Sequence, residues 1–161
     1  MAGLAKFTRK LNRGLLLDPF APVAFSIKDK ETIQKEGLVA VDGSWKLVDY
    51  AFMKIKWPKD KRRALPLLIA ANPTNFGKPF KLSTVEALAS ALYISGFIQE
   101  AMKIMNQFRW GHTFFQLNND YLEMYAQCKD SSEIIQVQRR IMNADRLIVD
   151  FTKFVEFRSN P

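Results

Sequence analysis

The stretch ANPTNFGKPFKLSTVEALA, residues 71–89, decides how this chain folds and where it would bind a ligand. It leaves the apolar run 64–71 through a loop, 71–82, that is rich in Asn, Pro and Gly. Proline stiffens such a path, and Gly77 permits a positive φ angle or a close backbone approach. The sequence therefore predicts a rigid loop that presents backbone groups to a ligand. The alternative is a structural crossing between two subdomains.

After the loop, Ser83-Thr84-Val85-Glu86 has the Ser-x-x-Glu form of a capping box, which predicts a helix from residue 83 to about 94. The first turn of a helix leaves backbone N–H groups unpaired, and these groups favour an anion such as a carboxylate or a phosphate. In sheets with crossover helices, ligands bind beyond the carboxyl ends of the strands. Loop 71–82 and the helix start that follows it are thus the first candidate site.

Strands and helices alternate before residue 82, whereas the pattern after it is helical. We expect a short strand at 24–26, a helix at 29–36, a buried strand at 38–41, a helix capped by Ser44, and a strand or edge segment within 64–71. Further helices are expected at about 97–108, 112–128 and 132–157. The predicted fold class is α/β, with a mainly parallel sheet and crossover helices followed by a helical C-terminal part.

We divide the chain into an N-terminal α/β subdomain, 1–71, and a mostly helical C-terminal subdomain, 72–161, which follows loop 71–82. Charge is also divided unevenly, because residues 1–82 carry a net charge of +9 and residues 83–161 carry −1. An excess of positive charge in one half indicates a phosphate-binding surface, although a solvated lysine-rich surface would give the same count.

Several classes of protein are excluded by composition. Cys128 is the single cysteine and His112 the single histidine, so the chain can form no internal disulfide and no Cys/His zinc site. No Gly-x-Gly-x-x-Gly or Walker sequence is present, which argues against a Rossmann nucleotide site. No run of about 18 apolar residues and no secretory leader is found, so we expect a cytoplasmic protein without membrane contact and without a metal.

A second stretch, VAVDGSW at residues 39–45, has the same order of strand, tight turn and helix. Asp42 falls at the carboxyl end of the strand and Trp45 in the first helical turn, so both side chains can face one crevice. A large π-face such as that of Trp45 can hold a cation, for example a sulfonium. The alternative makes Asp42 an N-terminal helix partner and Trp45 a core aromatic.

Together with VAVDGSW, the stretches LPLLIAANPTNFGKPFKLSTVEALASALYISGF at 65–97 and FRWGHTFFQLNNDYLEMYA at 108–126 carry a family resemblance. From about residue 15 to 126 the chain resembles the small-subunit ribosomal RNA aminocarboxypropyltransferases, a ribosome-biogenesis family with a SPOUT-like fold. The resemblance implies a trefoil knot that includes the cofactor loop, a rare exception to unknotted topology.

The resemblance also implies an activity. Such proteins bind S-adenosylmethionine and transfer its 3-amino-3-carboxypropyl group, not its methyl group, to N3 of a uridine-derived base in a hairpin loop of small-subunit rRNA. In eukaryotes that base is an N1-methylpseudouridine. The implied partner is small-subunit rRNA or the pre-ribosomal subunit, and the protein is expected to be a monomer.

Matching positions give the adenine side of the implied S-adenosylmethionine site. Backbone groups of Leu65 and Phe80 would hydrogen-bond the adenine edge. The apolar side chains that would pack on the adenine are those of Leu17, Pro19, Leu65, Leu82 and Ala87.

The rest of the implied site holds the ribose, the sulfonium and the carboxylate. The Val41 carbonyl would bind the ribose hydroxyls, and a backbone amide near Glu86 would bind the cofactor carboxylate. Trp45 and Val48, one helical turn apart, would enclose the methyl group and leave the carboxypropyl carbon open to attack. Asp42 is the candidate base for the N3 proton, or else a group that positions the cofactor.

Basic residues outside this site would contact RNA phosphates, and their number predicts RNA binding with a steep salt dependence. They are Lys6, Arg9, Lys10, Arg13, Lys28, Lys30, Lys61, Arg62 and Arg63.

One position departs from the family pattern, since Ala2 stands where a Ser or Thr hydroxyl would contact the cofactor carboxylate. This departure is typical of a truncated or misassigned N-terminus, and it calls full activity of the chain into question. Two other functions therefore stay open: an RNA methyltransferase of similar fold, and a non-catalytic RNA-binding assembly factor with a vestigial cofactor pocket.

Overall fold

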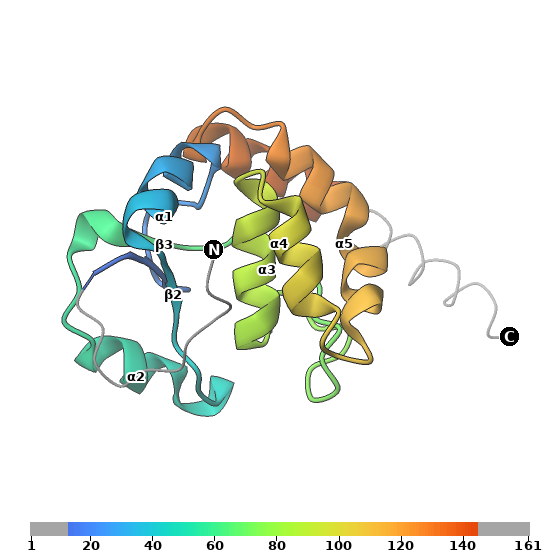
Figure 1. The fold of residues 1–161 in the computed structure, drawn as a ribbon, viewed down its shortest axis with the longest axis horizontal. Coiled ribbons are helices and arrows are strands. Elements are labelled where there is room, and N and C mark those ends of the chain that lie inside the picture. Colours follow the sequence, from blue (N-terminus) through green and yellow to red (C-terminus); the bar gives the residue numbers. More distant parts are fainter. Residues whose placement is uncertain (1–12, 145–161) are drawn as a thin grey trace, which may run out of the picture.

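The computed structural model describes residues 13–144, and its helices and strands form two groups (Figure 1). A small sheet with α1 (Lys30–Glu36) and α2 (Val48–Lys54) lies on one side of the molecule. The helices α3 (Thr84–Ile94), α4 (Ile98–Met105) and α5 (Gly111–Ala126) lie on the other. A further helix covers residues 131–144 of the described chain.

The sheet has three short parallel strands, β1 (Leu15–Leu17), β2 (Leu38–Ala40) and β3 (Arg62–Arg63), in the order β2-β1-β3. The chain between β1 and β2 contains α1, and the chain between β2 and β3 contains α2. The predicted α/β class, with a parallel sheet, crossover helices and a helical C-terminal part, is confirmed. Because the strands are parallel, their carboxyl ends meet at one edge of the sheet.

One hydrophobic core joins the sheet to the C-terminal helices. Leu15 of β1 and Phe25 belong to the same buried cluster as Phe114 and Tyr125 of α5 and Ile134 of the last described helix. The division at residue 71 stays a prediction, and the two parts on either side of it share this core.

The joint between α4 and α5 depends on a glycine. Gly111 is buried at the start of α5, and a Cβ atom at this position would lie 1.9 Å from the carbonyl oxygen of Met105. No other residue fits this approach without moving the backbone. The close contact therefore fixes how α5, which carries much of the core, follows α4.

Three features of the predicted sheet are wrong. The strand expected at 38–41 ends at Ala40 and is half-buried at the sheet edge, since β1 is its only strand neighbour among residues 13–144. The strand expected at 24–26 is a single bridge between Ala24 and Ala64. The apolar run 64–71 is not a strand, apart from isolated bridges at Ala64 and Ile69.

The reason for the last error is visible in the hydrogen bonds of that run. The Leu67 amide donates to Oε1 of Gln138 at 2.8 Å, and the Ile69 amide donates to Oδ1 of Asn118 at 2.7 Å. Side chains from two C-terminal helices thus satisfy backbone groups that a neighbouring strand would otherwise satisfy. The run 64–71 can therefore be extended and buried without pairing to a neighbouring strand.

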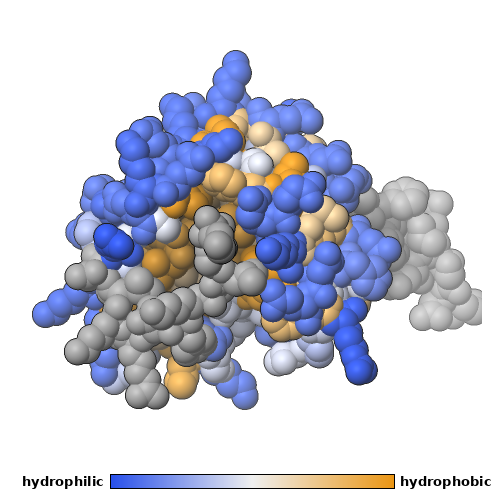
Figure 2. Space-filling view, in the orientation of Figure 1, coloured by the Kyte–Doolittle hydropathy of each residue, from blue (hydrophilic) through white to orange (hydrophobic). Residues whose placement is uncertain are grey.

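The predicted caps at Gly37 and Ser44 are confirmed, whereas the helices expected at about 97–108 and 112–128 are shorter at their C-terminal ends, at Met105 and Ala126. Gly37 closes α1 with φ 92°, and the Ser44 side chain accepts a hydrogen bond from the Lys46 amide. The hydrophilic surface in Figure 2 surrounds a smaller hydrophobic area near the middle of the visible face. Within residues 13–144, no helix combines the length and the apolar character needed to cross a bilayer.

Candidate functional site

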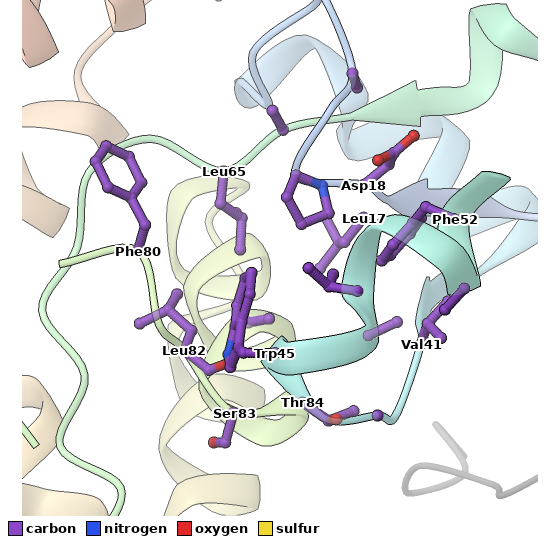
Figure 3. Close-up of a pocket in the computed structure, with 18 of the residues that line it drawn as sticks. Leu17, Asp18, Val41, Trp45, Phe52, Leu65, Phe80, Leu82, Ser83 and Thr84 are labelled. Carbon is purple, nitrogen blue, oxygen red and sulfur yellow. The ribbon is translucent and has the colours of Figure 1, made fainter. Parts of the chain in front are cut away.

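A cavity of about 1130 Å³ opens beyond the carboxyl ends of the strands, between the two candidate stretches. Segments from β1, the turn after β2, α2, the run after β3, and the start of α3 line it (Figure 3). Of the ten predicted cofactor residues, nine line this cavity, and only Glu86 does not. Asp42 also lines it. The nine residues are Leu17, Pro19, Val41, Trp45, Val48, Leu65, Phe80, Leu82 and Ala87.

The register of β1 against β2 explains why the Val41 carbonyl is free. The Leu15 amide donates to the Gly37 carbonyl at 2.9 Å, and in a parallel ladder such bonds repeat every two residues along both strands. Two steps further, residue 19 would donate to Val41, but residue 19 is a proline and has no N–H. Among residues 13–144 the Val41 carbonyl therefore ends the ladder without a backbone donor, as an acceptor at the edge of the cavity.

Two other backbone positions predicted for ligand binding also lie at the cavity. Among the described residues, neither the amide nor the carbonyl of Leu65 has a hydrogen-bond partner. Phe80 differs, because its amide donates to the Leu68 carbonyl at 2.9 Å and only its carbonyl remains available. Phe80 has φ 63°, a left-handed conformation that costs a bulky residue energy and that marks a constrained loop.

Trp45 is fixed at the centre of the cavity wall. Its indole Nε1 donates to the Leu82 carbonyl at 2.9 Å, and Figure 3 shows the ring standing between Leu82 and Leu17. The ammonium of Lys81 lies 4.7 Å from the ring centroid, although Lys81 does not line the cavity. The half-buried indole is thus held to loop 71–82 from one side, with the cavity on the other.

Asp42 and Thr84 join the two turns that form the floor of the cavity. The Thr84 hydroxyl donates to Oδ1 of Asp42 at 2.7 Å, across 42 positions of sequence. Sequence reasoning missed Thr84, because a Thr after a capping Ser is an ordinary first-turn residue. The signal that could have identified Thr84 is its position within the stretch 71–89, at the start of the helix that follows the loop.

Glu86 is fully buried, and its carboxylate closes loop 71–82 from inside. One oxygen accepts from the amides of Ala71 and Asn72 at 2.7 and 2.9 Å, and the other accepts from the Asn72 side chain at 2.8 Å and the Ser83 amide at 2.6 Å. These four hydrogen bonds satisfy the buried carboxylate and tie both ends of the loop to it. The predicted capping box is confirmed, and the Glu86 side chain serves the loop.

The same cap changes which amides face a ligand. The Glu86 amide donates to Ser83 Oγ at 3.3 Å, so it is already engaged. The backbone amides of Thr84 and Val85, in the first turn of α3, have no hydrogen-bond partner in the described chain. These two amides lie where a helix favours a negative group.

Of the six described basic residues that were predicted to contact RNA, three have acidic partners within the protein. Arg62 pairs with Asp18 at 2.9 Å and Arg63 with Asp29 at 2.9 Å, and their side chains are only 18% and 19% exposed. Lys61 pairs with Glu36, and this bond holds the pKa of Glu36 below its usual range. These three residues hold the sheet together, and the structure does not present them as a free cationic surface.

The remaining predicted cations differ in their surroundings. Arg13 and Lys28 are exposed, and the Lys30 ammonium lies 5.3 Å from the centroid of the Phe97 ring. Lys6, Arg9 and Lys10 lie outside the described residues, as does Ala2. No three His, Cys, Asp or Glu side chains gather as a metal site would require in residues 13–144.

A parallel sheet whose carboxyl edge opens on an apolar cavity, beside a helix start with amides unpaired in the described chain, defines an α/β protein with the kind of site at which such sheets bind ligands. The chain belongs to the family described as "Ribosome biogenesis protein, C-terminal", whose model matches residues 15–142.

Known proteins of this kind are similar along most of their length. The 16S rRNA aminocarboxypropyltransferase of Methanosarcina acetivorans is 44% identical over 133 residues, which cover 83% of this chain and 75% of that protein. The protein of the same name from Methanopyrus kandleri is 46% identical over 128 residues, 80% of this chain and 75% of its own. The SAM-dependent rRNA:acp-transferase Tsr3 from Vulcanisaeta distributa has a solved structure with a TM-score of 0.71 and 38% identity, covering 88% of this chain and 84% of that one.

Proposed function

We propose that this protein transfers the 3-amino-3-carboxypropyl group of S-adenosylmethionine to a base of small-subunit ribosomal RNA during ribosome biogenesis. The observation that carries the proposal is the single cavity that brings together nine positions chosen for an S-adenosylmethionine site. Relatives that are 42–46% identical and named as 16S rRNA aminocarboxypropyltransferases support it. We further propose that the acceptor atom is N3 of a uridine or a (methyl)pseudouridine in a hairpin loop.

The residues present fit S-adenosylmethionine part by part. Leu17, Leu65 and Leu82 give an apolar wall of adenine size, and the unpaired backbone groups of Leu65 supply a donor and an acceptor for its edge. The free Val41 carbonyl would accept from the ribose hydroxyls. The amides of Thr84 and Val85 take the role that we expected of Glu86, and would bind the carboxylate.

The chain contributes orientation. When bound, S-adenosylmethionine supplies a sulfonium with three attached carbons that are open to nucleophilic attack. Trp45 and Val48 would shield the methyl carbon, so that the first carbon of the carboxypropyl group faces the acceptor base. Alignment of this kind contributes up to about 7–11 kcal/mol to such reactions.

For Asp42 we propose a positioning role. Its Oδ1 already accepts from the Thr84 hydroxyl, at the helix start that would hold the cofactor carboxylate. Asp42→Asn keeps an acceptor oxygen and removes the charge, so positioning predicts a weaker cofactor affinity with kcat within about tenfold of wild type. A fall in kcat of about 10²-fold or more, the scale of general base catalysis, would assign the proton transfer to Asp42.

The test of the function uses S-adenosylmethionine labelled either in the methyl or in the carboxypropyl carbons, incubated with the protein and its own small-subunit rRNA. We expect carboxypropyl label in the RNA, lost in Trp45→Ala. Methyl label alone would leave a methyltransferase. Tight RNA binding without label would leave an assembly factor.

We also propose that the backbone follows the knotted SPOUT path, that residues 1–71 and 72–161 form its two subdomains, and that the protein acts as a cytoplasmic monomer. The side chains of Asn118 and Gln138, which bond the run before loop 71–82, support a C-terminal segment packed through that region. Joining the ends of the native chain and then denaturing the ring tests the knot. A knotted ring stays more compact than one closed from the denatured chain.

A further inference from the structure

The cavity has one wall that the cofactor does not explain. Four residues of the 3₁₀ turn Trp45–Leu47 and of α2 line it and are exposed: Lys46, Leu47, Tyr50 and Lys54. Leu47 is 65% and Tyr50 is 56% exposed, and they lie one helical turn apart. Large apolar side chains in this position contact solvent instead of the core, which is typical of a surface that meets another molecule.

The charges beside these side chains indicate what that molecule is. Lys46 and Lys54 have no acidic partner among residues 13–144, in contrast to Lys61, Arg62 and Arg63. The Lys54 ammonium donates to the Tyr50 hydroxyl and lies 3.9 Å from the centroid of the Tyr50 ring, so the cation is held at the hydroxyl end of an exposed aromatic side chain. An exposed aromatic ring beside unpaired cations is how proteins bind the bases and phosphates of unpaired nucleotides.

Reaction geometry leads to the same wall. In an in-line displacement the acceptor enters opposite the sulfur, through the open side of the cavity, and Leu47 and Tyr50 are exposed residues that line this cavity close in sequence to Trp45 and Val48. Reacting atoms have to come within about 3–3.5 Å of each other in line, which requires the acceptor base to be held flat and still. Tyr50 is the one aromatic residue of α2 that both lines the cavity and is exposed.

We propose that Tyr50 is the stacking platform for the acceptor base, with Lys54 contacting the adjacent phosphate and Leu47 packing against the sugar or the neighbouring base. This inference rests on the proposed transferase function and names the surface that takes its RNA substrate. The occupant is a single-stranded nucleotide of a hairpin loop, since a paired base exposes no face for stacking.

The experiment measures transfer of carboxypropyl label to a synthetic hairpin of the small-subunit rRNA, together with equilibrium binding of the hairpin and of S-adenosylmethionine. The variants are Tyr50→Ala, Tyr50→Phe, which keeps the ring, and Met53→Ala as the matched control. Met53 lies on the same helix, is 79% exposed and does not line the cavity.

We expect Tyr50→Ala to raise KM for the hairpin about 5- to 150-fold, the range that loss of one base–aromatic stack gives, while the Kd for S-adenosylmethionine stays within twofold. Met53→Ala should keep the wild-type KM. Tyr50→Phe retains the ring but loses the hydroxyl that Lys54 bonds, so its KM should stay much nearer to the wild-type value than that of Tyr50→Ala. Lys54→Gln should lower the slope of log K against log salt by about 0.7, the value for one phosphate of a single strand.

Three outcomes would overturn the proposal: an unchanged KM in Tyr50→Ala, an equal loss of cofactor affinity, or an equal loss in Met53→Ala. The second would place Tyr50 in the cofactor wall, and the third would show that α2 as a whole, and not the Tyr50 ring, determines binding of the hairpin. If the wild type transfers no label, the proposed function fails, and binding of the hairpin to the same variants still decides the role of Tyr50.

Discussion

Trp45 acts through two separate properties, its ring and its indole N–H. Only the N–H reaches Leu82, at 2.9 Å, and this bond ties the wall of the cavity to loop 71–82. Trp45→Phe keeps a ring and removes the bond. We expect the Kd for S-adenosylmethionine to rise about fivefold, from a loss of about 1 kcal/mol, while the carboxypropyl group remains the one transferred. Calorimetry measures the Kd, and the labelled-donor assay identifies the transferred group. Transfer of methyl label would contradict the shielding role of the ring.

Thr84 offers an equally specific test, because valine has nearly its shape. Thr84→Val removes the donor to Asp42 and leaves the helix start intact. For an exposed bond of this kind we expect about 1 kcal/mol, or roughly fivefold weaker S-adenosylmethionine binding. Thr84→Ser retains the hydroxyl and should bind as wild type does. Equal affinity in the valine variant would show that the Asp42–Thr84 bond does not shape the site.

Single residues of the site could be predicted where a motif fixed both their type and their place. Trp45 and Val41 follow from VAVDGSW, and Leu82 from loop 71–82, and all three line the cavity. The arginines could not be placed in this way. A run such as Lys61-Arg62-Arg63 resembles a solvated surface in sequence, and the buried carboxylates Asp18 and Asp29 that pair with the arginines lie over 30 residues away.

Loop 71–82 is an element without regular structure, and the Glu86 carboxylate organises it. Glu86→Gln places an NH₂ group among four donors, so at least two N–H groups lose their acceptor. Each buried unsatisfied donor costs about 1–3 kcal/mol, which predicts a loss of about 2–6 kcal/mol in the free energy of unfolding. Urea unfolding measures it.

The matched control for that prediction is Glu100→Gln, an exposed position in the first turn of α4. We expect it to unfold within about 0.5 kcal/mol of wild type. If Glu86→Gln were as stable as this control, the loop would be held by something other than the buried carboxylate.

Helices and caps were predicted well because their signals are local. Ser83 and Glu86 lie within one turn of each other, and both halves of the capping box are present. The strands were predicted poorly, because two or three residues give no periodicity and their pairing depends on distant segments. Leu67 and Ile69 show the limit: nothing near them in sequence indicates that Gln138 and Asn118 will satisfy their amides.

At the scale of the whole molecule, Tyr125 joins α5 to the run before loop 71–82. Its hydroxyl donates to the Leu67 carbonyl at 3.1 Å, and burial raises the pKa of the phenol, with smaller contributions from Tyr121 and Cys128. The folded-state pKa thus lies above the unfolded value of about 10. As pH rises above about 10 the unfolded chain loses this proton first, so the stabilising contribution falls.

Tyr125→Phe tests this linkage. We expect it to cost about 1 kcal/mol below pH 9, where the hydroxyl bond is intact, and to lose less stability than wild type between about pH 10 and 11. Urea unfolding at several pH values measures the difference between the two proteins. A difference that stays constant with pH would contradict the effect of burial on this phenol.

The bonds that reach from the last described helix to the first half of the chain also set the order in which the protein is completed. Ser131 Oγ accepts from the Ala24 amide, and Gln138, which lines the cavity, accepts from the Leu67 amide. A ribosome adds about 5–20 residues per second, so Leu17 is made roughly 6–24 s before Gln138. The binding cavity is therefore complete only after Gln138 has been made and has reached Leu67, so a nascent chain that ends before this residue lacks part of the cavity lining.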